Sequence, residues 1–180
     1  MAYAVELTLD YNSSQFIQSV WDDFAVKQIA EYAQQAGIHP HITLAIYEHV
    51  DCITCEEQLN SITQNVSQFE FTFTHLGLFM QQEIVLFIAP TVTKEMIDLH
   101  NEVVGNLEKH TRGAWDYYLP GNWTPHCTLA YNILPEKLPF ALSVAANIKL
   151  PFRAHATSIC VTEFQPVKTV FKISLKPPKI

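Results

Sequence analysis

The hexapeptides PHITLA (residues 40–45) and PHCTLA (residues 125–130) differ only at their third position. Their histidines, His41 and His126, lie 85 positions apart, which is about half of the 180-residue chain. A bare His-x-Thr triplet is a weak signal, and a third one, at 155–157, lacks the flanking proline and the Leu-Ala pair. Five identities in six positions, at equivalent places in two half-chains, indicate that a functional strand has been duplicated.

The elements around the two hexapeptides also follow a repeated order. Apolar alternation predicts strands at 3–10, 41–47, 69–79, 83–89, 125–133, 153–163 and 167–175. Helical spacing predicts a first helix that Gly37 ends, further helices near 54–68 and 93–110, and a helical or irregular stretch at 135–150. We therefore expect one α+β domain over residues 1–180, since no linker is long enough to separate two domains.

Strand geometry indicates what the repeated motif presents. Because residues i and i+2 share a face of a strand, each copy is expected to place a histidine, a threonine and an alanine on one face and apolar residues on the other. The polar-face residues are His41, Thr43, Ala45, His126, Thr128 and Ala130; the opposite-face residues are Ile42, Leu44, Ile46, Cys127, Leu129 and Tyr131. If the two units pack about a pseudo-two-fold axis, the polar faces meet across a groove.

Two imidazoles facing each other suit phosphoryl transfer without a metal ion. With a pKa near ~6.5, a neutral imidazole can take a proton from the attacking oxygen while a protonated one gives a proton to the leaving oxygen. Threonine hydroxyls can donate hydrogen bonds to the phosphate oxygens on which charge accumulates. This pattern predicts His41 and His126 as catalytic residues and Thr43 and Thr128 as phosphate-binding residues, with no metal and no cofactor.

The charge and composition of the chain limit the classes of ligand that it is expected to bind. The formal net charge is −7, and the chain has only two arginines, so a long nucleic acid is not expected as a ligand. A short phosphorylated molecule, held in a small local pocket, remains as the expected partner. No apolar run reaches the ~18 residues that a membrane-spanning helix needs, and we expect a cytoplasmic protein. The four cysteines are then expected to be reduced thiols. We also expect the protein to be a monomer.

The two motifs, each with its preceding proline and following leucine, resemble those of the 2H phosphoesterase superfamily, which includes the 2′,5′ RNA ligase and cyclic nucleotide phosphodiesterase branches. The resemblance implies a bilobal, pseudo-two-fold α+β fold of antiparallel sheets with helices packed outside and a central cleft. It also implies metal-independent action on 2′,3′-cyclic phosphates or 2′–5′ phosphodiester bonds. By position, His41 and His126 match the family's catalytic histidines, and Thr43 and Thr128 match its phosphate-contacting hydroxyls.

Alternatives to this interpretation remain open. His39 shares a face with His41 if the strand begins early, and this pair could bind zinc in a metal-dependent hydrolase. A nucleotide or RNA-end binding protein without turnover would use the same scaffold. Cys52 and Cys55 form a lone CxxC pair, and Cys55 is expected in a first helical turn, where the pKa of a thiol falls.

Further residues are candidates for substrate recognition or for structural roles. In the aromatic loop 111–123, Tyr118 and Trp123 are candidates for substrate binding by stacking on a base. His39 is a third candidate for substrate binding. Structural roles are expected for the four remaining histidines considered, His75, His100, His110 and His155.

Overall fold

One antiparallel sheet of eight strands organises the computed structural model, which describes residues 2–30, 38–164 and 166–178. The strands are β1 (Ala2–Leu9), β2 (His41–Val50), β3 (Phe69–Met80), β4 (Ile84–Pro90), β5 (Thr111–Ala114), β6 (Cys127–Ile133), β7 (Phe152–Phe164) and β8 (Lys168–Ser174). The α-helices are α1 (Tyr11–Val26), α3 (Cys52–Thr63), α4 (Lys94–Leu107) and α5 (Leu138–Ala145). The predicted α+β class with antiparallel strands is confirmed.

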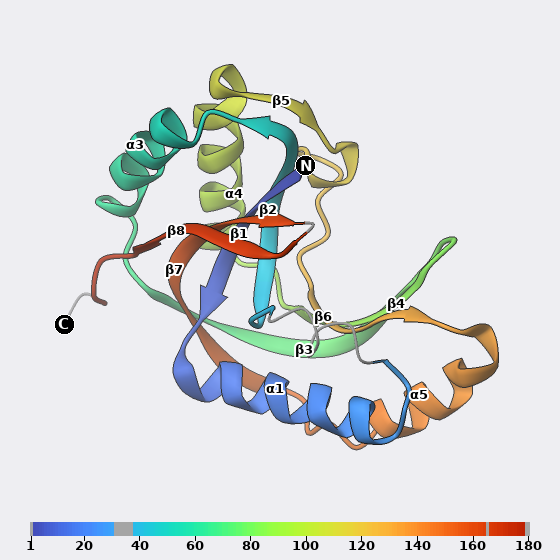
Figure 1. The fold of residues 1–180 in the computed structure, drawn as a ribbon. Helices are drawn as coiled ribbons and strands as arrows, with labels where there is room; N and C mark the ends of the chain where they lie inside the picture. Colours follow the sequence, from blue (N-terminus) through green and yellow to red (C-terminus); the bar gives the residue numbers. More distant parts are fainter. Residues whose placement is uncertain (1, 31–37, 165, 179–180) are drawn as a thin grey trace.

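The long strand β7 connects the two halves of the sheet, whose order is β5-β2-β1-β7-β3-β4-β6. Its first residues, 152–156, pair with β3, and residues 158–163 pair with β8, while β1 runs along the other side of β7. The two motif strands therefore lie far apart in strand order, β2 beside β1 and β6 beside β4. Figure 1 shows the sheet twisting between these two ends.

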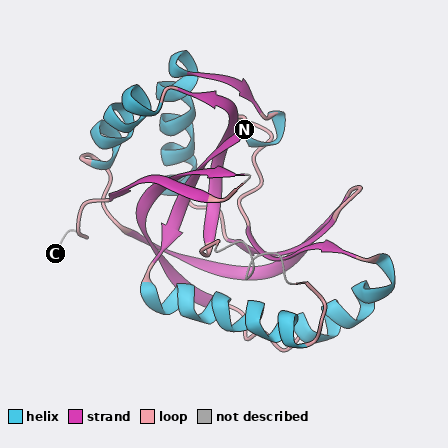
Figure 2. Cartoon of the chain, viewed as in Figure 1, coloured by secondary structure: helices cyan, strands magenta, loops and turns pink. Residues whose placement is uncertain are grey.

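Two helices pack crosswise behind the motif strands. Helix α1 precedes β2 in the chain but contacts β6, and helix α4 precedes β6 but contacts β2. In Figure 1, α3 and α4 lie at the upper left of the sheet and α1 and α5 lie below it, and Figure 2 shows the helices flanking the strands. This exchange interlocks the two half-chains. None of the helices in the described residues is long and apolar enough to cross a membrane.

Helix α1 is shorter than the sequence predicts. Asp10 caps its N-terminus by accepting a hydrogen bond from the backbone N–H of Ser13, which satisfies one of the free N–H groups there. The helix ends at Val26, and Gln28 then adopts a φ of 53°, a left-handed conformation that does not continue a helix. The predicted continuation is therefore wrong from residue 27, and residues 31–37, with Gly37, lie outside the described part of the chain.

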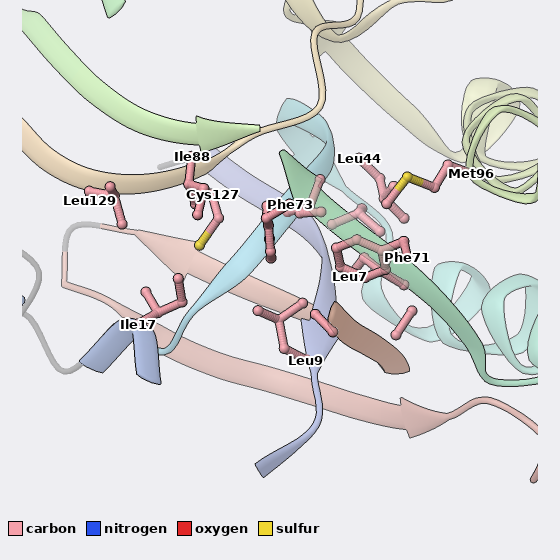
Figure 3. Packing of buried hydrophobic residues seen from close by; sticks show 14 of the residues in the cluster. Leu7, Leu9, Ile17, Leu44, Phe71, Phe73, Ile88, Met96, Cys127 and Leu129 are labelled. Carbon is pink, nitrogen blue, oxygen red and sulfur yellow. The ribbon is translucent and has the colours of Figure 1, made fainter. Parts of the chain in front are cut away.

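The core holds the motif strands from behind. Leu44 of β2 lies close to Met96 of α4, and Cys127 and Leu129 of β6 lie near Ile17 of α1 (Figure 3). Each of these side chains is at most 2% exposed, so each motif strand presents its apolar residues to the core cluster. Burial of such side chains stabilises the fold by about 1.5–3 kcal/mol each. The apolar side chains of the two motif strands therefore hold these strands against the core.

Candidate active site

A β-bulge breaks the alternation at the same place in both motifs. In β2, Val5 pairs with Ala45 but Glu6 pairs with Thr43, so Leu44 is the extra residue. In β6, Leu86 pairs with Ala130 but Phe87 pairs with Thr128, so Leu129 is the extra residue. Bulges of this kind redirect side chains and are frequent beside active sites.

After each bulge, the side chains lie on the opposite face of the strand from the one that the sequence predicts. Ala45 and Ala130 belong to the core cluster, whereas Ile46 and Tyr131 line cavities. The alternation expected from sequence therefore holds only up to each threonine, and a large side chain replaces each alanine in the cleft. The predictions that Ala45 and Ala130 floor the groove, and that Ile46 and Tyr131 face away from it, are wrong because each bulge inserts one residue.

Two adjoining cavities lie at the motif strands. One, of about 410 Å³, is lined by His41 and Thr43; the other, of about 520 Å³, is lined by His126. Thr128 lines both cavities. So do three aromatic residues, Trp115, Tyr118 and Tyr131. Strands β2 and β6 also contact each other directly, and His41 acts electrostatically on His126. The structure therefore brings together the four predicted motif residues from the two half-chains.

The two imidazoles are oriented in the same way. Nδ1 of His41 lies 2.7 Å from the carbonyl oxygen of His39, and Nδ1 of His126 lies 2.7 Å from the carbonyl oxygen of Thr124. A carbonyl only accepts hydrogen bonds, so Nδ1 must be the protonated nitrogen in each neutral ring. The lone pair of each ring is then on Nε2. Both histidines are thereby prepared to exchange a proton at Nε2.

Two tryptophans hold the motif strands reciprocally. Nε1 of Trp123, in the loop before β6, donates to the carbonyl of Thr43 at 2.9 Å. Nε1 of Trp21, on α1, donates to the carbonyl of Thr128 at 3.0 Å. Each bond joins one half-chain to the motif threonine of the other, so the relative position of the two motifs is fixed by hydrogen bonds as well as by packing.

His126 lies in an apolar environment. The ring centroids of Phe79 and Phe87 are 4.9 and 5.2 Å from that of His126. Burial lowers the pKa of His126 below its usual value of 6.5; the hydrogen bond to the Thr124 carbonyl opposes this shift, and the nearby His41 adds to it. The neutral form of His126 is therefore favoured at neutral pH.

We expect His126 to titrate below pH 6.5 in an NMR titration of its imidazole, and Phe79→Ala to move its pKa back toward 6.5 by admitting water. Because the pKa of His126 is lower in the folded protein than in the unfolded chain, the contribution of His126 should lower the free energy of unfolding as the pH falls below 6.5. Phe140→Ala, which removes an exposed ring of α5, is the control and should leave the titration unchanged. A His126 pKa at or above 6.5 would contradict this description of the site.

A buried carboxylate, Glu6 on β1, stands beside the first motif. It is 4% exposed, and its two oxygens lie 3.5 Å from Nε2 of His41 and 3.5 Å from Nε2 of His39. The hydroxyl of Thr162 donates to the same carboxylate at 2.9 Å. Sequence reasoning missed this residue, although one acid inside the apolar strand AYAVELTL is a recognisable signal.

His39 lines the smaller cavity, and its Nε2 is buried and has no hydrogen-bond partner among the residues that the structure describes. Burial is the largest cause that lowers the pKa of His39; Glu6 opposes this effect. Donor atoms of Glu6, His39 and Cys160 all lie within 4.8 Å of one another. A cation-binding group in the described residues would therefore combine His39 with these two residues, not with His41 as the sequence suggests.

The aromatic loop contributes unequally to the cavities. Tyr118 lines both of them, and its pKa is raised by burial, an effect that a hydrogen bond with Thr43 partly offsets. Trp123 lines neither cavity; it stacks on His100 with the ring centroids 4.1 Å apart. The structure thus gives Trp123 a role in holding β2, and it leaves Tyr118, together with Trp115, in position to contact a ligand.

The cysteines are poorly suited to nucleophilic chemistry. Burial raises the pKa of Cys55 to about 11 and that of Cys127 to about 12, so both thiols stay protonated at neutral pH. The lowered pKa expected for Cys55 from its helical position is therefore wrong. Cys52 also has a raised pKa, again mainly because of burial.

The remaining histidines do not line the two motif cavities. His100 is 2% exposed and its Nε2 hydrogen-bonds the carbonyl of Tyr118 at 2.9 Å. His155, in the third His-x-Thr triplet, lies on the surface between Asp10 and Glu70. The third triplet therefore lies outside the two motif cavities.

Comparison with known proteins agrees with this architecture. Residues 11–166 match the family model described as the 2′-5′ RNA ligase superfamily. The TT0787 protein of Thermus thermophilus superposes with a TM-score of 0.67 at 14% identity, over 99% of this chain and 100% of that one. LigT of Escherichia coli in its apo form gives a TM-score of 0.61 at 14% identity, over 97% of each chain.

A further LigT structure was solved with 3′-AMP; it gives a TM-score of 0.60 at 16% identity, over 96% of this chain and 97% of that one. No curated protein matches the sequence significantly. At these identities the solved structures establish the shared fold.

Proposed function

This chain belongs to the 2′-5′ RNA ligase superfamily, and on that premise we propose that it is a metal-independent phosphoesterase acting on 2′,3′-cyclic phosphates or 2′–5′ phosphodiester bonds. The observation that carries the proposal is the matched orientation of two imidazoles from distant parts of the chain. Each has its Nδ1 held by a carbonyl at 2.7 Å and its Nε2 left for proton transfer. A small nucleotide or an RNA end is the substrate class that the two cavities suit.

In hydrolysis of a cyclic phosphate, a water oxygen forms a bond to phosphorus and one ester P–O bond of the ring breaks. We assign His126 as the base, since burial lowers its pKa and keeps Nε2 free to accept the proton of the water. His41, with the Glu6 carboxylate 3.5 Å away as a charge partner, gives its Nε2 proton to the departing ribose oxygen. The reverse direction exchanges the two roles.

The threonines complete the reacting centre. Thr43 and Thr128 stand two residues after the histidines, before the bulge; Thr43 lines the smaller cavity and Thr128 lines both. Hydroxyl groups placed there stabilise the charge that develops on the non-bridging oxygens. Tyr118 and Trp115 line both cavities and supply flat surfaces for a nucleobase. These residues support a nucleotide as the ligand.

The test is turnover of a panel of 2′,3′-cyclic nucleotides and 2′–5′ dinucleotides in the presence of a chelator. We expect hydrolysis of at least one class, with a rate that the chelator leaves unchanged, because the proton transfers need only the two imidazoles. Binding without turnover would instead support a nucleotide or RNA-end binding protein on this fold.

One observation favours a second candidate, a metal-dependent hydrolase. It is the convergence of donor atoms from Glu6, His39 and Cys160 within 4.8 Å. Carboxylate, imidazole and thiolate are all zinc ligands. This candidate predicts that the chelator abolishes turnover and that Cys160→Ser is as inactive as His126→Ala. The principal proposal predicts that Cys160→Ser stays active in the chelator.

A further inference from the structure

Apart from the His41 imidazole, which the proposed function uses in its protonated form, no permanently cationic side chain of the described residues lines either cavity. The residues lining the smaller cavity include one carboxylate, Glu6, and those lining the larger include another, Glu83. Within the described part of the chain, no lysine or arginine lines either cavity, and the sequence of residues 31–37 contains neither type. Lys172 acts electrostatically on His39 and Cys160 but does not line the smaller cavity. Phosphate-binding sites for multiply charged ligands usually contain such cations.

Glu6 lies beside two of the residues that the proposed function assigns to the phosphoryl centre. It pairs with Thr43 across the β1–β2 ladder, and its carboxylate is 3.5 Å from Nε2 of His41. Both of these neighbours are the groups that the proposed function assigns to the phosphoryl centre. Thr162 donates to the carboxylate at 2.9 Å from β7, and the residue is only 4% exposed. The negative charge is therefore fixed in place and poorly screened by solvent.

We propose that Glu6 makes this cleft select a singly charged phosphodiester over a doubly charged phosphomonoester. The inference rests on the proposed function and specifies its substrate by charge. A carboxylate repels each ligand charge, so the second charge of a terminal phosphate roughly doubles the penalty. A cyclic phosphate or an internal diester carries one charge, whereas a terminal phosphate carries nearly two above its second pKa of about 6. The same repulsion favours release of the phosphomonoester product.

The test compares two ligands that differ by one methyl group. They are 2′-O-methyladenosine 3′-phosphate and its phosphate methyl ester, neither of which has the free 2′-hydroxyl needed for cyclisation. Dissociation constants are measured by calorimetry at pH 8 for the wild type, Glu6→Gln and Glu6→Asp. A control variant, Glu48→Gln, removes an exposed carboxylate from β2, outside both cavities.

The wild type is expected to prefer the methyl ester, and Glu6→Gln to reduce that preference by about tenfold, as one charge at this range implies. Glu6→Asp and Glu48→Gln should keep it. Because the preference is a ratio within one protein, a loss of folded protein cancels. An unchanged ratio in Glu6→Gln would overturn the inference. Failure of the wild type to bind either ligand would overturn the proposed function itself, which is a separate outcome.

Discussion

Replacing His41 or His126 by alanine is expected to lower kcat/KM for a 2′,3′-cyclic nucleotide by about 10³-fold, with the folded structure retained. The magnitude follows from the 10²–10⁴-fold contribution that a positioned general acid or base makes. Both rings have their Nδ1 bound to a local carbonyl and project Nε2 toward the adjoining cavities. The His126 ring anchors no distant element by a hydrogen bond in the described structure, and Glu6, the ionic neighbour of His41, keeps Thr162 and His39 as partners, so the loss should appear in catalysis. Steady-state kinetics and thermal melting measure the two effects separately.

His155→Ala is the matched control, because His155 belongs to the third His-x-Thr triplet and lies outside both cavities. It should retain the wild-type rate. Retention of full activity in His41→Ala or in His126→Ala would exclude the two-histidine mechanism.

Replacing Thr43 or Thr128 by valine is expected to lower kcat by about 10²-fold, the usual effect of removing one donor that stabilises developing negative charge. Valine keeps the branched shape of threonine, and the backbone carbonyls that bind Trp123 and Trp21 are untouched. The loss should therefore fall on kcat more than on KM. A loss confined to KM would show that the hydroxyls bind the substrate and its transition state equally.

Thr157→Val provides the comparison for the threonine variants. The hydroxyl of Thr157 donates to the backbone carbonyls of Thr8 and Leu9, so its loss should lower stability while leaving kcat unchanged. A fall in kcat as large as that of Thr43→Val would show that the threonine effects arise from weakened packing.

The repeated hexapeptide predicted that His41, Thr43, His126 and Thr128 come together, and the order of the apolar patterns predicted the α+β class, because strand alternation is visible in the sequence itself. The bulges at Leu44 and Leu129 could not be predicted, because one inserted residue leaves no mark in composition. Each bulge turns the residues that follow it to the opposite face of the strand. Tyr131 therefore lines the cavities at the position where the sequence predicts an alanine.

Contacts between residues that are far apart in the chain could not be predicted from the sequence either. Glu6 approaches His41 only because β1 and β2 pair in this register, and Trp21 reaches Thr128 only because α1 packs on the strand of the other half-chain. The length of α1 was overestimated because Ile29 continues the apolar stripe; it is buried although the helix has already ended at Val26.

The most direct test of the central claim, that His41 and His126 act as one acid–base pair, is kcat/KM of the double variant His41→Ala/His126→Ala beside the two single variants. Groups that act as a unit are strongly non-additive, since removing one already abolishes the concerted step. We expect the double variant to be about as slow as either single variant. Losses that multiply, taking kcat/KM of the double variant far below that of both single variants, would show two independent contributions and exclude a coupled acid–base pair.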